Sequence, residues 1–168
     1  MTGLSDALRS WDGKSTVALR AQYARHGDTP DFVDRLLSAP AGSRRAATWL
    51  IKMHVEKGHR LNAPTVARLI ELAGDETAHW ETVLHCLQAL ALQSIPESKT
   101  EELASTLKQL TGHKRPFVRA WAYGGALSLS RQVPHLVDWA DSLCRAALQS
   151  EPPSIRARLR QLGYPPPA

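Results

Sequence analysis

The apolar residues of this chain recur at intervals of three and four, as on one face of an α-helix, without the alternation typical of strands. Turn signals separate the helical patterns. Asn62 and Pro64 suit the N-cap and first turn of a helix that we expect to end at Gly74. Pro116 and the pair Pro152–Pro153 precede later helices in the same way. The pattern therefore predicts an all-α fold of short helices joined by short turns.

The helical patterns repeat with a spacing of 37 residues. In the second helix of each unit, three apolar columns at i, i+4 and i+7 form one face: Ala46/Val83/Ala120, Leu50/Leu87/Gly124 and Met53/Leu90/Leu127. In the first helix of each unit, two columns keep the same spacing: Val33/Ile70/Leu107/Cys144 and Leu36/Ala73/Leu110/Ala147. Because one helix pair cannot bury both of its apolar sides, we expect adjacent pairs to stack into a continuous core.

This repeat predicts a single domain over residues 1–168. Four helix pairs account for residues 30–162. Residues 1–28 hold two more helices that do not keep the register, as expected of an N-terminal capping unit. The proline-rich residues 163–168 are expected to form a flexible tail.

Two segments carry a motif at the start of the second helix of a pair. They are PFVRAWAYGGALSL, Pro116–Leu129, and the truncated IRARLRQL, Ile155–Leu162. With the 37-residue spacing, these segments resemble HEAT repeats, or the related armadillo-like repeats. The resemblance covers about four fifths of the chain. It implies a right-handed α-α superhelix (solenoid) of about five helix pairs, whose second helices line a concave surface. It also implies that an acidic residue before each second helix pairs with that helix's arginine.

An arginine column, Arg45, Arg119 and Arg156, runs along the edge of the apolar face in the 37-residue register, with Thr82 in place of the arginine in the second unit. These arginines either pair with turn carboxylates and cover neighbouring repeats, or form a row of cations along the concave groove. Together with the side chains expected on the same surface, the candidate binding residues are Arg45, Trp49, Lys52, Trp80, His85, Arg119, Tyr123, Arg156 and Arg160. In the third unit, Ala122 and Ala126 occupy the matching outward positions.

Five tryptophans are many for 168 residues. Trp121 lies on the apolar side of its helix and is expected in the core. Trp49 and Trp80 lie nearer the polar side, where they either anchor a partner or fill gaps between repeats. Gly124-Gly125, in the middle of a helix, costs about 1 kcal/mol per glycine relative to alanine. We therefore expect either close approach of a neighbouring helix, with Trp121 supplying the bulk, or a local kink; packing is favoured over approach of a ligand.

Composition narrows the function without identifying it. The net charge of +5 comes mainly from arginine and permits an acidic protein or a nucleic acid as partner. Cys86 and Cys144 lie in apolar patterns, which indicates buried thiols and a reducing compartment. With no signal-like or membrane-length apolar segment, we expect a cytoplasmic protein without membrane association. No histidine spacing suits a metal, and no catalytic motif or phosphate loop is present, so no metal, cofactor or catalytic residue is assigned.

These observations favour a non-enzymatic binding or scaffold module that presents a basic, tryptophan-containing concave groove to a protein or an acidic peptide. The alternative is a nucleic-acid-binding protein. HEAT-like DNA alkylation repeat glycosylases cradle damaged duplex in a cationic concave surface, and this chain is similar to them in architecture and charge. A third hypothesis is a structural subunit that assembles through an exposed end of the stack.

Overall fold

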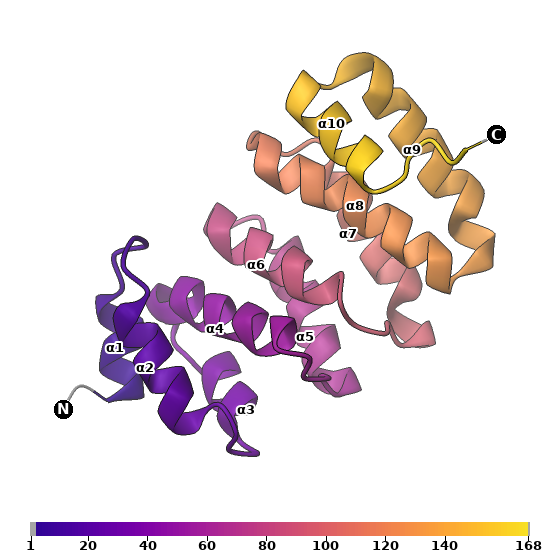
Figure 1. Ribbon diagram of the computed structural model, residues 1–168. Helices are drawn as coiled ribbons and strands as arrows, with labels where there is room; N and C mark the ends of the chain where they lie inside the picture. The colour runs from indigo at the N-terminus through magenta and orange to yellow at the C-terminus, as the bar shows by residue number, and fades with distance from the viewer. Residues whose placement is uncertain (1–2, 168) are drawn as a thin grey trace.

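A computed structural model describes residues 3–167, and this part of the chain consists of helices and turns without a strand (Figure 1). The α-helices are α1 Leu4–Ser10, α2 Val17–His26, α3 Phe32–Leu37, α4 Arg44–Glu56, α5 Ala63–Gly74, α6 Trp80–Leu90, α7 Thr100–Leu110, α8 Pro116–Gln132, α9 Val137–Ser150 and α10 Pro153–Gln161. Short 3-10 turns, at Ala41–Ser43, Glu97–Lys99 and Pro134–Leu136, precede α4, α7 and α9. The predicted all-α class is confirmed.

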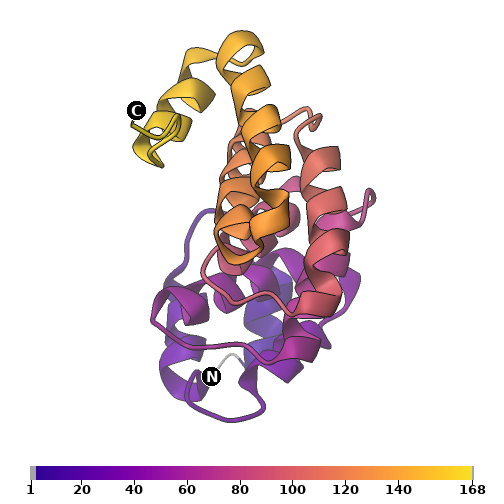
Figure 2. The ribbon, with the colours of Figure 1, turned by 90° about the vertical axis from the view of Figure 1, so that its right-hand side faces the viewer.

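Successive helices pack as neighbours along the chain. Helices α3 and α4, α5 and α6, α7 and α8, and α9 and α10 contact each other as sequential pairs. Helices α4, α6, α8 and α10 also contact one another in series, as do α3, α5 and α7. Figures 1 and 2 show the chain advancing from α1–α3 at one end to α9 and α10 at the other. Helices α1 and α2 pack against the start of this array, on α4.

Residues 37 positions apart meet in space. Thr48 Oγ1 on α4 lies 3.2 Å from His85 Nδ1 on α6, and the Ile95 amide donates to Gln132 Oε1 at 3.0 Å. The sequence period therefore corresponds to contacts between equivalent positions of adjacent helix pairs.

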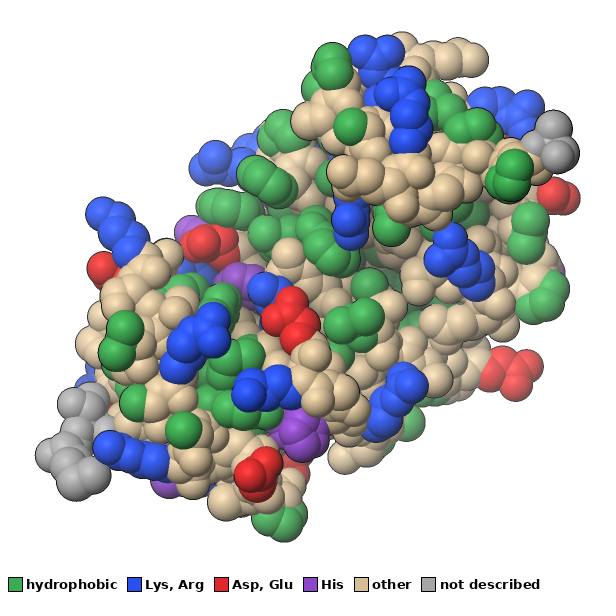
Figure 3. Space-filling model, viewed as in Figure 1, with side chains coloured by type: hydrophobic (Ala, Val, Ile, Leu, Met, Phe, Trp, Pro, Cys, Tyr) green, Lys and Arg blue, Asp and Glu red, His purple; other side chains and the backbone are tan. Residues whose placement is uncertain are grey.

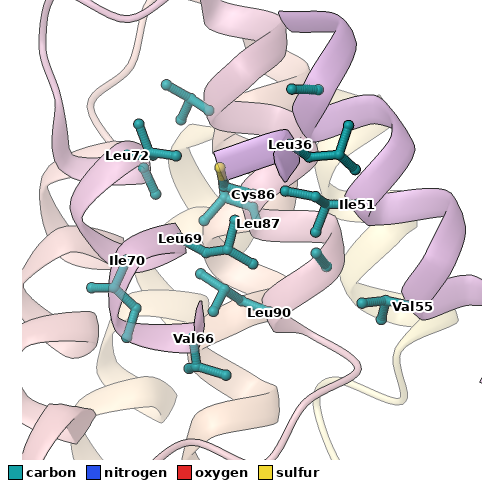
Figure 4. Close-up of a cluster of buried hydrophobic side chains, with 14 of the residues drawn as sticks. Leu36, Ile51, Val55, Val66, Leu69, Ile70, Leu72, Cys86, Leu87 and Leu90 are labelled. Atoms are coloured by element: carbon teal, nitrogen blue, oxygen red, sulfur yellow. The ribbon is translucent and has the colours of Figure 1, made fainter. Parts of the chain in front are cut away.

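The predicted apolar columns are buried in α4 and α6, and Figure 4 shows part of this core, with Ile51, Cys86 and Leu87 among its members. The α8 columns differ, because Ala120, Gly124 and Leu127 are only half-buried.

Helix α8 turns a different face inward. Its fully buried residues are Val118, Ala122, Ala126 and Leu129. The outward placement of Ala122 and Ala126 is therefore wrong. Helix α8 contacts four other helices, α6, α7, α9 and α10, so its buried face depends on several neighbours at once. Small residues there let the helices approach closely.

The glycine pair of α8 lies at such an approach. A Cβ at Gly125 would lie 2.7 Å from Leu107 Cδ2, and one at Gly124 would lie 3.1 Å from Leu162 Cδ1. The expected close packing is confirmed. The bulk comes from these two leucines and not from Trp121.

Two glutamines tie adjacent helix pairs together, a feature the sequence patterns did not reveal. Gln93 Oε1 accepts from the Leu61 amide at 2.8 Å, and its Nε2 donates to the His59 carbonyl at 3.3 Å. Gln132 repeats the arrangement one pair later, since it accepts from Ile95 and donates to the Gln93 carbonyl at 3.3 Å. These bonds hold the turn of one pair against the helix end of the next.

The end of the chain is anchored at Tyr164. This side chain is 6% exposed, and its hydroxyl donates to Asp141 Oδ1 at 2.7 Å. The expectation of a flexible tail over 163–168 is therefore wrong at Tyr164, while position 168 lies outside the described residues.

Candidate binding surfaces

The arginine column forms joints between successive helix pairs. Arg45 Nε lies 3.1 Å from Glu81 Oε2. Arg119 Nε and Nη2 donate to the two Glu151 oxygens, each at 3.0 Å, and Nη1 donates to the His113 carbonyl at 2.9 Å. In both cases the carboxylate belongs to the following helix pair, whereas the resemblance implied an acidic residue before the arginine's own helix. The sequence left two roles open for the arginine column. Arg45 and Arg119 have the structural one, in which each pairs with a carboxylate.

The remaining predicted cations divide into paired and unpaired side chains. Lys52 Nζ lies 3.3 Å from Glu56 Oε1. Arg156 and Arg160 form no ion pair within residues 3–167. The buried Nε of Arg156 has no hydrogen-bond partner in the same range, and Arg160 is exposed. Unpaired charge from the predicted set therefore lies on α10.

Trp11, which no sequence pattern singled out, brings together three of the candidate binding residues. Its ring lies 6.2 Å from that of Trp49 and 6.4 Å from that of His85, and the Arg45 guanidinium lies 4.8 Å above it. Gly13 follows at φ 82°, and a Cβ there would lie 1.6 Å from Arg45 Nη2, so the turn after α1 packs directly on Arg45. In the sequence, the tryptophan directly before an Asp-Gly turn was the feature that could have indicated this contact. The α1–α2 turn thus covers this part of the predicted groove.

His85 and Tyr123 are buried and do not offer contact area to a partner. His85 is 6% exposed, and burial lowers its pKa to about 4, with the Lys52 charge acting in the same direction. Tyr123 is also 6% exposed and donates to Glu151 Oε1 at 3.0 Å. Burial and this carboxylate raise the pKa of Tyr123 to about 12. The placement of both residues on an open groove is wrong.

Arginines cover two further tryptophans. The Arg115 guanidinium lies 5.1 Å from the centroid of Trp80, and that of Arg158 lies 4.7 Å from the centroid of Trp121. Trp121 is half-buried at the edge of the core and not within it, contrary to expectation. Both rings combine an apolar surface with a nearby cation.

A cleft of about 400 Å³ lies between the N-terminal ends of α8 and α10, and we call it the α8–α10 cleft. Its lining residues are Pro116, Phe117, Ala120, Trp121, Ser154, Ile155 and Arg158. Phe117 is 69% exposed, although it is a large apolar residue. Neither helix receives a hydrogen bond from a capping side chain within the described residues. The cleft thus combines apolar walls with two helix N-termini, which favour negative charge.

The net positive charge of the protein falls in the C-terminal segment that contains this cleft. Residues 111–168 contain eight Lys and Arg against three Asp and Glu, a net charge of +5, whereas residues 1–110 contain 13 of each. In Figure 3, Lys, Arg and hydrophobic side chains are seen over α8 and α10, and the acidic ones lie at the right margin and from mid-height downward. Counting charge by segment would have revealed this asymmetry.

Two of the three acidic residues in that segment are already engaged. Glu151 pairs with Arg119, and Asp141 pairs with Arg145 and accepts from Tyr164. The hydrogen bonds from Tyr164 and Arg145 lower the pKa of Asp141, which therefore stays ionised.

The thiols of Cys86 and Cys144 are buried, as expected. Burial raises the pKa of each to about 12, so they stay protonated at neutral pH and are unsuited to nucleophilic chemistry.

In the part of the chain that the structure describes, no group of three or more His, Cys, Asp or Glu is placed to hold a metal. Over the same residues, no helix has the length and apolar character needed to cross a membrane. Comparison of the chain with protein-family models, curated proteins and solved structures finds no match.

Proposed function

We propose that this protein is a HEAT-like helical-repeat module, a right-handed α-α superhelix, that binds an acidic segment of another protein without catalysing a reaction. The serial contacts among α4, α6, α8 and α10 support the repeat architecture, as do the contacts between residues 37 positions apart. A solenoid of this kind offers extended surfaces for partner binding.

The observation that carries the binding function is the location of the net charge. All of the +5 falls in residues 111–168, the segment that also forms a cleft with apolar walls. Since Arg45, Lys52 and Arg119 are neutralised by Glu81, Glu56 and Glu151, the predicted row of cations does not extend along the whole array. The binding surface is instead the C-terminal third, where Arg156 and Arg160 are free to meet carboxylates of a partner.

Nucleic-acid binding is the second candidate, favoured by cations that lie beside aromatic rings. Arg20 lies 5.4 Å from the Trp49 centroid, next to Trp11 with its covering Arg45. Bases stack on exposed aromatic faces. Here the protein's own guanidinium groups and the neighbouring rings already occupy those faces. A duplex also needs an extended positive surface, whereas residues 1–110 carry no net charge. An acidic protein segment therefore has the stronger support.

Fluorescence anisotropy with a fluorescein-labelled oligoglutamate peptide tests the proposal, with a labelled DNA duplex as the competing probe. We expect the peptide to bind and its affinity to fall between about 50 and 300 mM NaCl, as screening shortens the range of the charges. The double variant Arg156→Glu/Arg160→Glu is expected to weaken binding at least about ten-fold.

The matched control is Arg9→Glu/Arg35→Glu, which makes the same change in net charge on exposed residues of the N-terminal part. Equal weakening by both double variants would show that peptide affinity depends on the net charge of the whole protein. That result would overturn the C-terminal site. Tighter binding of the duplex at equal salt would replace the proposal by the second candidate. Absence of peptide binding at low salt would reject the proposed function.

A further inference from the structure

We infer that the α8–α10 cleft seats one large apolar side chain, aromatic or leucine, from the acidic segment, while flanking carboxylates meet the arginines of α10. This inference rests on the proposed function and specifies its partner as an acidic segment with an apolar anchor. Charge alone would hold any acidic chain, whereas a shaped apolar cleft selects among acidic chains.

The walls of the cleft fit an apolar anchor. Phe117 is 69% exposed on one side, and Trp121, with Arg158 over its ring, and the buried Ile155 complete the lining. The volume of about 400 Å³ lies at the lower end of the range of roughly 300–1,000 Å³ for sites that bury small ligands. It accommodates one large side chain and is too small for a whole helix. An anchor seated there removes the exposed Phe117 ring from water, which favours binding.

One arginine of α10 lines the cleft, and two more lie on the same helix outside the lining, within reach of carboxylates that flank the anchor. Arg158 lines the cleft, with its guanidinium 4.7 Å from the Trp121 centroid. On the same helix, Arg156 and Arg160 have no ion-pair partner in residues 3–167, and the Arg156 Nε makes no hydrogen bond there. The nearby Glu151 carboxylate is occupied by Arg119 and does not compete.

The cleft is held open before any partner arrives. The hydrogen bonds from Arg119 to Glu151 connect the first turn of α8 to the turn that leads into α10. The Tyr123 hydroxyl donates to the same carboxylate at 3.0 Å. Because both sides of the cleft are fixed relative to each other, binding requires little ordering of the protein, and such preorganisation favours affinity.

Two labelled peptides that differ at one central position test the inference: oligoglutamate with a central phenylalanine, and the same peptide with a central alanine. We expect the wild-type protein to bind the phenylalanine peptide at least about ten-fold more tightly. Phe117→Ala should remove most of this preference, because it removes the exposed apolar wall of the cleft. Leu92→Ala, which shortens a side chain that is 52% exposed elsewhere, is the matched control and should retain the preference.

Ser154→Phe gives an independent check, because it fills the cleft from an exposed position without removing any contact of the core. It should also abolish the preference, while circular dichroism shows an unchanged helical content. Equal affinities of the wild type for both peptides, or a preference that survives Phe117→Ala and Ser154→Phe, would overturn the inference and leave the proposed function standing. Failure of both peptides to bind would instead reject the proposed function itself.

Discussion

Replacement of Glu151 by alanine breaks the joint between the start of α8 and the turn into α10. The carboxylate accepts hydrogen bonds from Arg119 Nε and Nη2 and from the Tyr123 hydroxyl, each at 3.0 Å. The side chains of Arg119 and Glu151 are only 17% and 11% exposed. In Glu151→Ala the guanidinium keeps the His113 carbonyl, at 2.9 Å, and loses its counter-charge.

The expected loss of stability follows from these contacts. A hydrogen bond to a charged group contributes about 1.5–3 kcal/mol, and removal of one partner from a buried ion pair costs about 3–5 kcal/mol. Because Arg119 is partly exposed and retains one carbonyl, we expect Glu151→Ala to lower the free energy of unfolding by about 2–4 kcal/mol. With an m-value of roughly 2 kcal/mol/M in urea, the unfolding midpoint falls by about 1–2 M.

Urea unfolding followed by circular dichroism at neutral pH measures this shift. Glu101→Ala is the matched control, because Glu101 pairs with His135 at 2.7 Å but is 74% exposed. We expect that control to change stability by less than about 0.5 kcal/mol. Hydrogen exchange should show the amides of α10 losing protection first, since the broken joint lies beside that helix. A midpoint for Glu151→Ala equal to that of Glu101→Ala would refute a structural role for the pair.

Two further measurements test other parts of the fold. Burial lowers the pKa of His54 and His85 to about 4, from 6.5 in the unfolded chain. As the pH falls below about 6.5, the unfolded chain therefore binds protons at these histidines and the folded protein does not, which favours unfolding. Stability should therefore drop by about 2–4 kcal/mol from pH 7 to pH 5, and a constant urea midpoint would contradict this. Gly13→Ala should destabilise more than Gly58→Ala by about 1 kcal/mol in the same assay. Both glycines have positive φ, but only at Gly13 does a Cβ meet Arg45, and equal losses would show that this contact has no effect.

The sequence predicted which helices exist and which are neighbours, because the 37-residue columns report on burial along each helix. It failed on the rotation of α8. Alanine occurs on both buried and exposed faces of helices, so the sequence alone does not decide where Ala122 and Ala126 lie. They are buried because α8 contacts four neighbouring helices. Trp121 was misplaced for the same reason. The face of a helix that packs against several neighbours cannot be derived from its own periodicity.

The candidate site was less predictable, because it depends on pairs of residues far apart in the sequence. Glu151 lies 32 residues after Arg119, and no local pattern connects them. Trp11 reaches Arg45 from the α1–α2 turn, outside the repeat register. Phe117 follows a helix-starting proline, and its place in a cleft depends on the packing of α10 beside α8.

The joints of the arginine column explain why the binding charge lies where it does. Arg45 receives Glu81 from the following helix pair, and Arg119 receives Glu151 in the same way. Arg156 continues the column, yet no carboxylate of residues 3–167 pairs with it. On the proposed function, a partner's carboxylate meets the outer guanidinium nitrogens of Arg156, since its Nε is buried, whereas Arg45 and Arg119 contact their glutamates through Nε.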